Sequence, residues 1–258
     1  MNKTKDPDQC KSRLEWLEEG SAAPEVEERL RNLCVLAVGL KQLSEWPEYS
    51  HFDMRDYALE LHPEQPRSDG YILLSPDDVY GVEPSVMRGE CNTVACALGH
   101  GPMFGIRPAS STVLGRNLWF SYASKFIDYG TNAHEWFFSG AWAHVEGHDT
   151  PLGAAKRIAY WLGSNDVRVD HRIVDFMLEF TVMSDDDIST GNYIAGRIYN
   201  DEEEALQDLN VEMDALGFEG IIARMKAVLT EEQLTGIAWT DWEAQEKDLQ
   251  KFTVKNHE

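Results

Sequence analysis

The chain has 258 residues, enough for one large core or two modest domains, since domains cluster near ~100–150 residues. It carries 45 acidic and 23 basic residues, a formal net charge of −22. This balance argues against direct nucleic-acid binding, because phosphates require a basic surface. No apolar stretch approaches the ~18 residues of a membrane-spanning helix, so we expect no membrane contact. The acidity has two interpretations: solubility alone, and mimicry of nucleic acid in a partner's basic groove.

The cysteines indicate the compartment. Cys10, Cys34, Cys91 and Cys96 are unevenly spaced, and no apolar run of the kind found in signal peptides follows Met1. We therefore expect a cytoplasmic protein with reduced thiols.

The first half of the chain contains one clear helix. Residues 1–20 are polar, and we expect a flexible or docking N-terminal arm. Pro24 stands where a first helical residue is favoured, and apolar residues then recur every three or four positions to near Ser44, which predicts an amphipathic helix. Residues 46–90 are rich in proline and predict irregular structure with at most a short strand.

The least generic segment is residues 89–102. Asn92 or Thr93 can cap a short helix through Leu98, which Gly99 or Gly101 would end before Pro102. Its small side chains let neighbouring backbones approach closely. We therefore predict a short helix at the centre of the core.

Two chemical hypotheses compete with this structural interpretation. In the first, Cys91 is a nucleophile activated by the helix N-terminus and by His100, His144 or His148 as the base. In the second, Cys96 and His100 join His144 and His148 in a zinc site, because both pairs have i,i+4 spacing. Zinc sites usually contain closer cysteine pairs, and free cysteines are among the most buried residues. We therefore favour structural cysteines and expect no metal or cofactor.

Residues 119–148 form the most aromatic region. A ligand pocket there would use Trp136, His148 and Thr93, because planar groups stack on aromatic rings. An aromatic core is the alternative interpretation. Thr150 as N-cap and Pro151 at the first position then predict a helix that ends at Gly163.

The rest of the chain predicts further helices, over about 169–180, 201–216 and 218–229. The acidic turn 184–187 fits a helix start better than a calcium loop, because the glycine and glutamate that such a loop needs are absent. Capping boxes at Thr230 with Gln233 and at Thr240 with Glu243 predict two more short helices.

Four segments together resemble a family of short hypothetical proteins of bacteria and their phages. These are Phe52-Asp53-Met54, the run from Cys91 to His100, Thr150-Pro151, and Arg157-Ile158 in the helix that follows. The family pattern is F-D-M, then C-G-T-x-A-C-x-x-G-H, then T-P, and the match covers about residues 26–163. The chain departs from it at Asn92, where the family has glycine. The resemblance implies a compact cytoplasmic module, phage-encoded or bacterial, and assigns it no reaction.

We therefore expect a mainly α-helical protein with long irregular loops and little β-structure. Residues 21–165 would form the core domain with the Cys/His motif, and 166–258 an acidic helical extension that is a subdomain or a homo-oligomer contact. The predicted function is that of a non-enzymatic acidic accessory protein, phage-encoded, that binds a protein partner and modulates a host factor. The alternative is a small-ligand-binding protein or thiol-dependent enzyme with a cleft formed by Cys91, His100 and His144.

Overall fold

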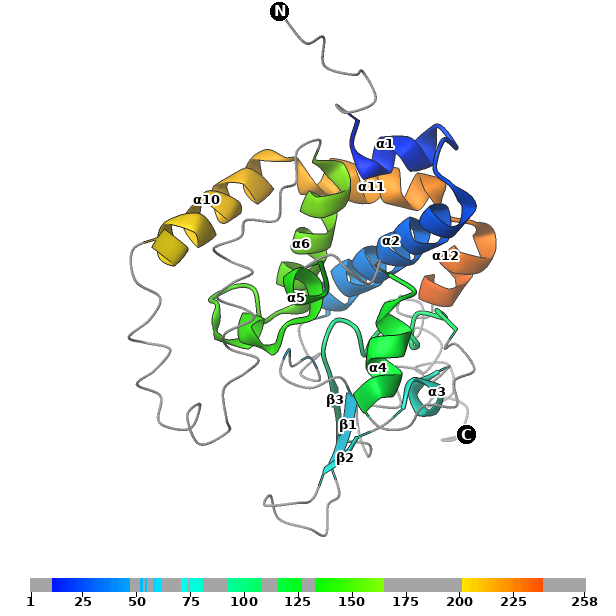
Figure 1. Ribbon diagram of the computed structural model, residues 1–258, viewed down its shortest axis with the longest axis vertical. Helices are drawn as coiled ribbons and strands as arrows, with labels where there is room; N and C mark the ends of the chain where they lie inside the picture. The colour runs from blue at the N-terminus through cyan, green and yellow to red at the C-terminus, as the bar shows by residue number, and fades with distance from the viewer. Residues whose placement is uncertain are drawn as a thin grey trace, which may run out of the picture.

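The fold is mainly α-helical, as predicted, with one small antiparallel sheet (Figure 1). The computed structural model describes residues 11–46, 52, 54, 58–61, 71–73, 75–80, 92–107, 116–126, 133–164 and 201–238. The helices are α1 (Arg13–Glu18), α2 (Pro24–Ser44), α3 (Pro76–Val79), α4 (Arg116–Ala123), α5 (Ala133–Phe138), the 3-10 helix η3 (Gly140–His144), α6 (Pro151–Gly163), α10 (Asp201–Ala215), α11 (Phe218–Val228) and α12 (Glu231–Ala238); the strands are β1 (Ala58–Leu61), β2 (Tyr71–Leu73) and β3 (Asn92–Ala95).

Helices α2 and α6 form the centre of the molecule, and both have the predicted bounds. Pro24 occupies the first turn of α2, and Thr150 caps α6 by accepting a hydrogen bond from the backbone N–H of Gly153. Alanines dominate the buried face of α6, so the two helices can pack closely. α1 and α11 lie against this pair, as Figure 1 shows.

The prediction of a central helix in residues 89–102 is wrong. Residues 92–95 form strand β3, and turns follow through Gly105. β3 pairs with β1, with Leu61 opposite Asn92 and Ala58 opposite Ala95, and β1 also pairs with β2. Thr93 and Val94 are β-branched and favour a strand wherever a partner strand is present. Ala95, Cys96, Ala97 and Leu98 are nevertheless buried in the core, as the small side chains predict.

The proline-rich region contains more structure than predicted. It holds strands β1 and β2 and the one-turn helix α3, which Ser75 caps in a capping box with Asp78. Each strand is only three or four residues long. Strands this short depend on pairing with one another, so their local sequence carries little signal.

The C-terminal helices pack on the central pair. α11 contacts α2 and α6, and α12 contacts α2. The predicted helices near 201–216 and 218–229 and the Thr230–Gln233 capping box are confirmed. The predictions for 169–180, for 184–187 and for Thr240 with Glu243 lie outside the described residues. Within the described part of the chain, no helix is long and apolar enough to cross a membrane.

Candidate functional site

Three of the four segments on which the family resemblance rests lie close together in the structure. Phe52 forms a parallel bridge with Ala95, and its ring centroid lies 5.5 Å from that of His100. Two residues later, the Met54 sulfur lies 3.9 Å from Nη2 of Arg157 on α6. Residues 52 and 54 therefore link the buried stretch around His100 to the central helix.

Arg157 is a fully buried cation. Its Nη1 donates to the carbonyl oxygen of His148 at 2.8 Å and lies 3.3 Å from that residue's Nδ1. The guanidinium carbon lies 4.2 Å from the ring centroid of Trp142, in a cation–π contact. No carboxylate of the described residues forms an ion pair with Arg157, and its Nε has no hydrogen-bond partner among them. Burial lowers the Arg157 pKa to about 9, and the charge of Asp149 partly opposes this shift. The cation is therefore held by a ring face and by dipoles.

His148 is held as a neutral ring. It stacks on Trp142, with centroids 4.9 Å apart and an interplanar angle of 26°. Burial, and then the charge of Arg157, lower the His148 pKa to about 4. Its Nε2 lies 2.9 Å from Oδ1 of Asn210, an atom that only accepts hydrogen bonds. The ring therefore carries its proton on Nε2 and offers Nδ1 as an acceptor to Arg157.

A glycine pair places His148 over the start of α6. Gly147 adopts a left-handed conformation with φ of +78°. A Cβ added at Gly153 would lie 2.7 Å from Cα of His148, so only glycine allows this close approach. The loop that contains His148, the Thr150 cap of α6 and the buried Arg157 therefore depend on one another.

The cluster continues to the acidic helix α10. Besides the bond between His148 and Asn210, Lys156 forms an ion pair with Asp214 at 2.9 Å, and the Tyr160 hydroxyl donates to Glu212. These contacts hold one side of α10 against α6 and leave its other side exposed.

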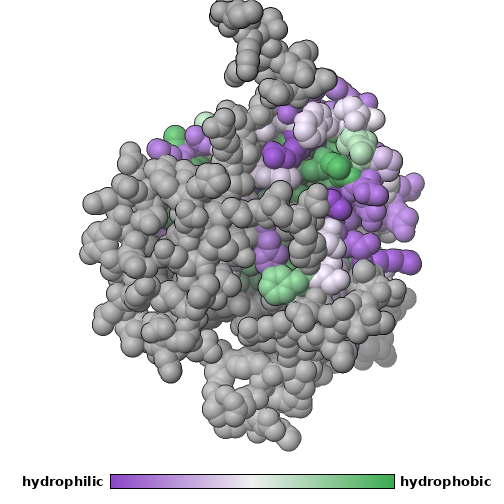
Figure 2. All heavy atoms as spheres, viewed as in Figure 1, coloured by the Kyte–Doolittle hydropathy of each residue, from purple (hydrophilic) through white to green (hydrophobic). Residues whose placement is uncertain are grey.

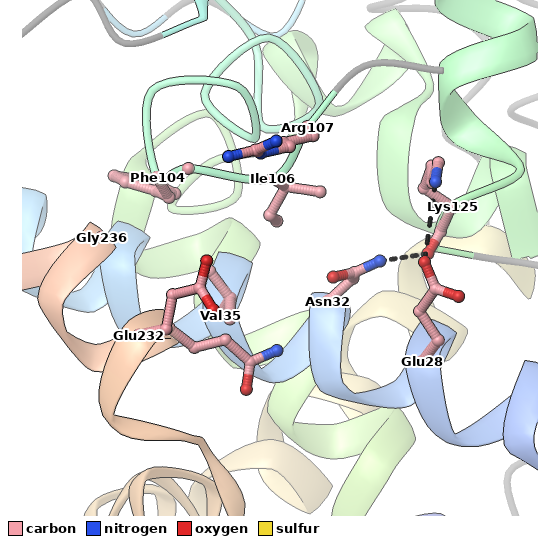
Figure 3. A pocket seen from close by; sticks show the side chains of 11 residues that line it. Glu28, Asn32, Val35, Phe104, Ile106, Arg107, Lys125, Glu232 and Gly236 are labelled. Atoms are coloured by element: carbon pink, nitrogen blue, oxygen red, sulfur yellow. Dashed lines mark hydrogen bonds and ion pairs between the residues drawn. The ribbon is translucent and has the colours of Figure 1, made fainter. Parts of the chain in front are cut away.

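A cavity of about 150 Å³ lies apart from this cluster (Figure 3). It opens between α2, the turn at residues 104–107, the segment after α4, and α12. Its lining combines charged, amide and apolar groups: Glu28, Asn32, Val35, Phe104, Gly105, Ile106, Arg107, Lys125, Glu232, Gln233 and Gly236. A Cβ added at Gly236 would lie 3.0 Å from the carbonyl oxygen of Phe104, so α12 packs closely against the turn.

The residues predicted to form a site lie elsewhere. His100 is buried, and its Nδ1 lies 2.7 Å from the carbonyl oxygen of Cys96, which is buried too. Trp136 is buried edge-to-face against Trp142. Neither these residues nor His148 line the cavity.

The remaining predicted site residues stay untested. Cys91 and the side chains of Thr93 and His144 lie outside the described part, so the predicted Cys91–His100–His144 cleft stays a prediction. Among the described side chains, no three His, Cys, Asp or Glu residues are grouped closely enough to hold a metal ion.

Sequence reasoning missed the roles of Arg157 and Asn210 and the whole cavity. One feature of the sequence pointed to Arg157. The residue lies between Ala154 and Ile158 on the apolar face of a helix, where burying a charge costs free energy unless other groups contact it. No feature of the sequence pointed to Asn210 or to the cavity residues, because segments distant in the sequence bring them together.

No protein-family model, no curated protein and no solved structure matches the chain.

Proposed function

We propose that the protein is a non-enzymatic, acidic binding protein that docks onto a basic surface of a protein partner through α10. The observation that carries the proposal is the charge of the C-terminal helices. Residues 201–238 contain ten acidic and two basic residues. Of the two cations, Arg224 is held by the carboxylate of Glu18, which leaves Lys226 to balance the rest.

The exposed side of α10 gives this charge a defined shape. We call the residues at positions 208, 211, 212 and 215 the α10 ridge; they follow the i, i+3, i+4, i+7 spacing of one helical face. Val211 is 69% exposed between Asp208 and Glu212, whereas Leu209 and Met213 are buried. Glu212 is exposed as well, although its carboxylate also accepts the hydrogen bond of Tyr160. An exposed apolar side chain between carboxylates fits a partner surface in which basic residues surround an apolar contact.

The partner class follows from this chemistry and from the family resemblance. A negative ridge attracts surfaces that normally bind phosphates, and long-range attraction speeds such encounters. In a phage-encoded protein, the partner would be a host protein whose basic groove the ridge occupies. This is the host-modulating function that the sequence predicts.

The test compares two variants that raise the net charge by the same amount. The first, Asp208→Lys with Val211→Lys, changes the α10 ridge. The control, Glu25→Lys with Glu146→Gln, changes exposed carboxylates elsewhere. Wild-type protein on a matrix captures partners from a host lysate, and the captured protein is identified, purified and titrated against each variant.

We expect wild-type binding to weaken as salt rises, because charged surfaces are screened. The ridge variant should bind at least about tenfold more weakly than wild type and the control within about twofold, since interface charges act locally. Equal loss in both variants, salt-independent binding, or capture of nothing above an empty matrix would overturn the proposal.

A further inference from the structure

The cavity described above is lined by two unlike charges that pair with no other described residue. Arg107 comes from the turn after Ile106, and Glu232 from the first turn of α12. Both side chains are exposed, and neither forms an ion pair or hydrogen bond with any other described residue. Figure 3 shows them on two sides of the same opening. The other charged pair of the lining is internally satisfied, because Lys125 lies 3.6 Å from Glu28.

Asn32 adds an acceptor to the floor of this opening. Its amide nitrogen donates to the carbonyl oxygen of Lys125 at 3.0 Å, which fixes the orientation of the side chain. Its carbonyl oxygen accepts no hydrogen bond from the described residues, and Figure 3 shows this oxygen turned away from Lys125. The residue is 9% exposed, and a ligand N–H that reached this oxygen would give it a hydrogen-bond partner.

Apolar side chains complete the lining. Val35, Phe104 and Ile106 are themselves buried, and they face the cavity beside the polar groups. The volume of about 150 Å³ limits the ligand, since an engineered cavity of that size in another protein holds one benzene molecule. A ligand close to benzene in size fits within it, whereas most of a nucleotide or a folded peptide segment would protrude into solvent.

We propose that this cavity binds a free α-amino acid with a small apolar side chain, such as valine. Arg107 binds the carboxylate, Glu232 and the oxygen of Asn32 bind the ammonium group, and the apolar wall contacts the side chain. A net-neutral zwitterion suits a chain of net charge −22 better than an anion, which the overall field repels. A plain cation would leave Arg107 unused.

The first test is calorimetric titration of the full-length protein with valine and two capped analogues. N-acetylvaline keeps the carboxylate and loses the ammonium group; valine amide does the opposite. We expect saturable binding of valine and at least about tenfold weaker binding of each analogue, because each leaves one charged contact unmade. Equal binding of all three compounds would overturn the proposal, as would no saturable binding of valine up to about 10 mM, a range suited to so small a ligand.

The second test assigns each charge to its partner. Glu232→Gln should weaken valine binding at least about tenfold and leave the remaining affinity for N-acetylvaline unchanged, because that compound has no ammonium group. Arg107→Gln should weaken valine binding to the same extent and leave the affinity for valine amide unchanged. The matched controls are Glu231→Gln and Lys226→Gln, which remove exposed charges outside the cavity lining.

Both controls should keep valine affinity within about twofold of wild type. If Glu231→Gln weakens binding as much as Glu232→Gln does, the effect is general electrostatics and the assignment is wrong. All four positions are exposed, so the variants should fold, which thermal unfolding of each variant checks. The cavity and the α10 ridge share no residue, so either proposal can fail alone.

Discussion

His148 Nε2 lies 2.9 Å from Oδ1 of Asn210, 62 residues further along the chain. This hydrogen bond joins the buried Arg157 cluster to the acidic helix α10. The placement of α10 therefore depends on His148 keeping its position in the interior. Protonation at Nδ1 leaves the Nε2–H donor to Asn210 in place, but it removes the acceptor next to Arg157 and brings two cations together. Acid should therefore loosen the His148 loop, and α10 with it, before the rest of the molecule unfolds.

The His148 pKa makes stability depend on pH. Folding lowers it from 6.5 to about 4, so between these values the unfolded chain binds a proton that the folded protein does not. The contribution is fully present above pH 6.5 and is lost as the pH falls towards 4. At about 1.4 kcal/mol per pKa unit, the shift corresponds to about 3 kcal/mol. Urea unfolding from pH 7 to pH 4 measures this loss.

Other carboxylates titrate in the same range, so His148→Gln serves as the reference. A glutamine can still donate to Asn210 and cannot be charged. We expect the stability advantage of wild type over this variant to shrink by about 3 kcal/mol between pH 7 and pH 4. Parallel pH profiles for the two proteins would show that His148 is protonated equally easily in both states.

Gly153→Ala should destabilise the protein through its effect on His148. The new Cβ would lie 2.7 Å from Cα of His148, and backbone atoms cannot give way without moving the loop. We expect a loss of about 2–3 kcal/mol in the free energy of unfolding. Hydrogen exchange of the α10 amides should also become faster, because the Asn210 bond depends on this loop.

Gly220→Ala is the matched control for this substitution. Gly220 is likewise the third residue of its helix, and a Cβ there would meet nothing within 4 Å. Alanine should therefore stabilise the helix by about 0.5–1 kcal/mol, through its higher helix propensity. A similar effect of both substitutions would show that close approach at Gly153 is unimportant.

The helices could be predicted from the sequence because each carries its own signals. Pro24, Thr150 and the Thr230–Gln233 pair mark helix starts, and apolar residues at three- and four-residue steps mark the buried faces. These signals are interactions between residues close in the sequence, so a short stretch of sequence is enough to predict each helix.

Long-range contacts account for what could not be predicted. The run Thr93–Leu98 satisfies helix rules locally, but pairing of β3 with β1 decides its conformation. The role of Arg157 depends on Trp142 in η3 and on His148 in the loop that follows η3. The cavity is assembled from four separate segments, and no periodicity in one segment describes it.

Arg157→Lys should cost more stability than Arg13→Lys. Both arginines lie over a tryptophan: the Arg157 guanidinium carbon is 4.2 Å from the Trp142 ring centroid, and that of Arg13 is 3.8 Å from Trp161. Arg157 is fully buried, however, and a lysine there cannot reproduce the planar stack and the bond to the His148 carbonyl. We expect a loss of about 2–4 kcal/mol at position 157 and about 1 kcal/mol or less at position 13. Urea unfolding at pH 7 measures both; equal losses would mean that burial of the Arg157 cation has little consequence.

Thiol alkylation followed by mass mapping tests the placement of the central stretch. Cys34 and Cys96 are buried, and burial raises the Cys34 pKa to about 12. Iodoacetamide reacts with exposed thiolates, so at neutral pH both cysteines should stay unmodified until denaturant unfolds the protein. Rapid native modification of Cys96 would contradict its place in the core.

The same experiment tests the predicted nucleophile, Cys91, with Cys10 as the internal reference. Modification of Cys91 much faster than Cys10 would indicate a low-pKa thiolate and favour the thiol-dependent enzyme, whereas a rate equal to or below that of Cys10 would leave binding through α10 as the function to pursue.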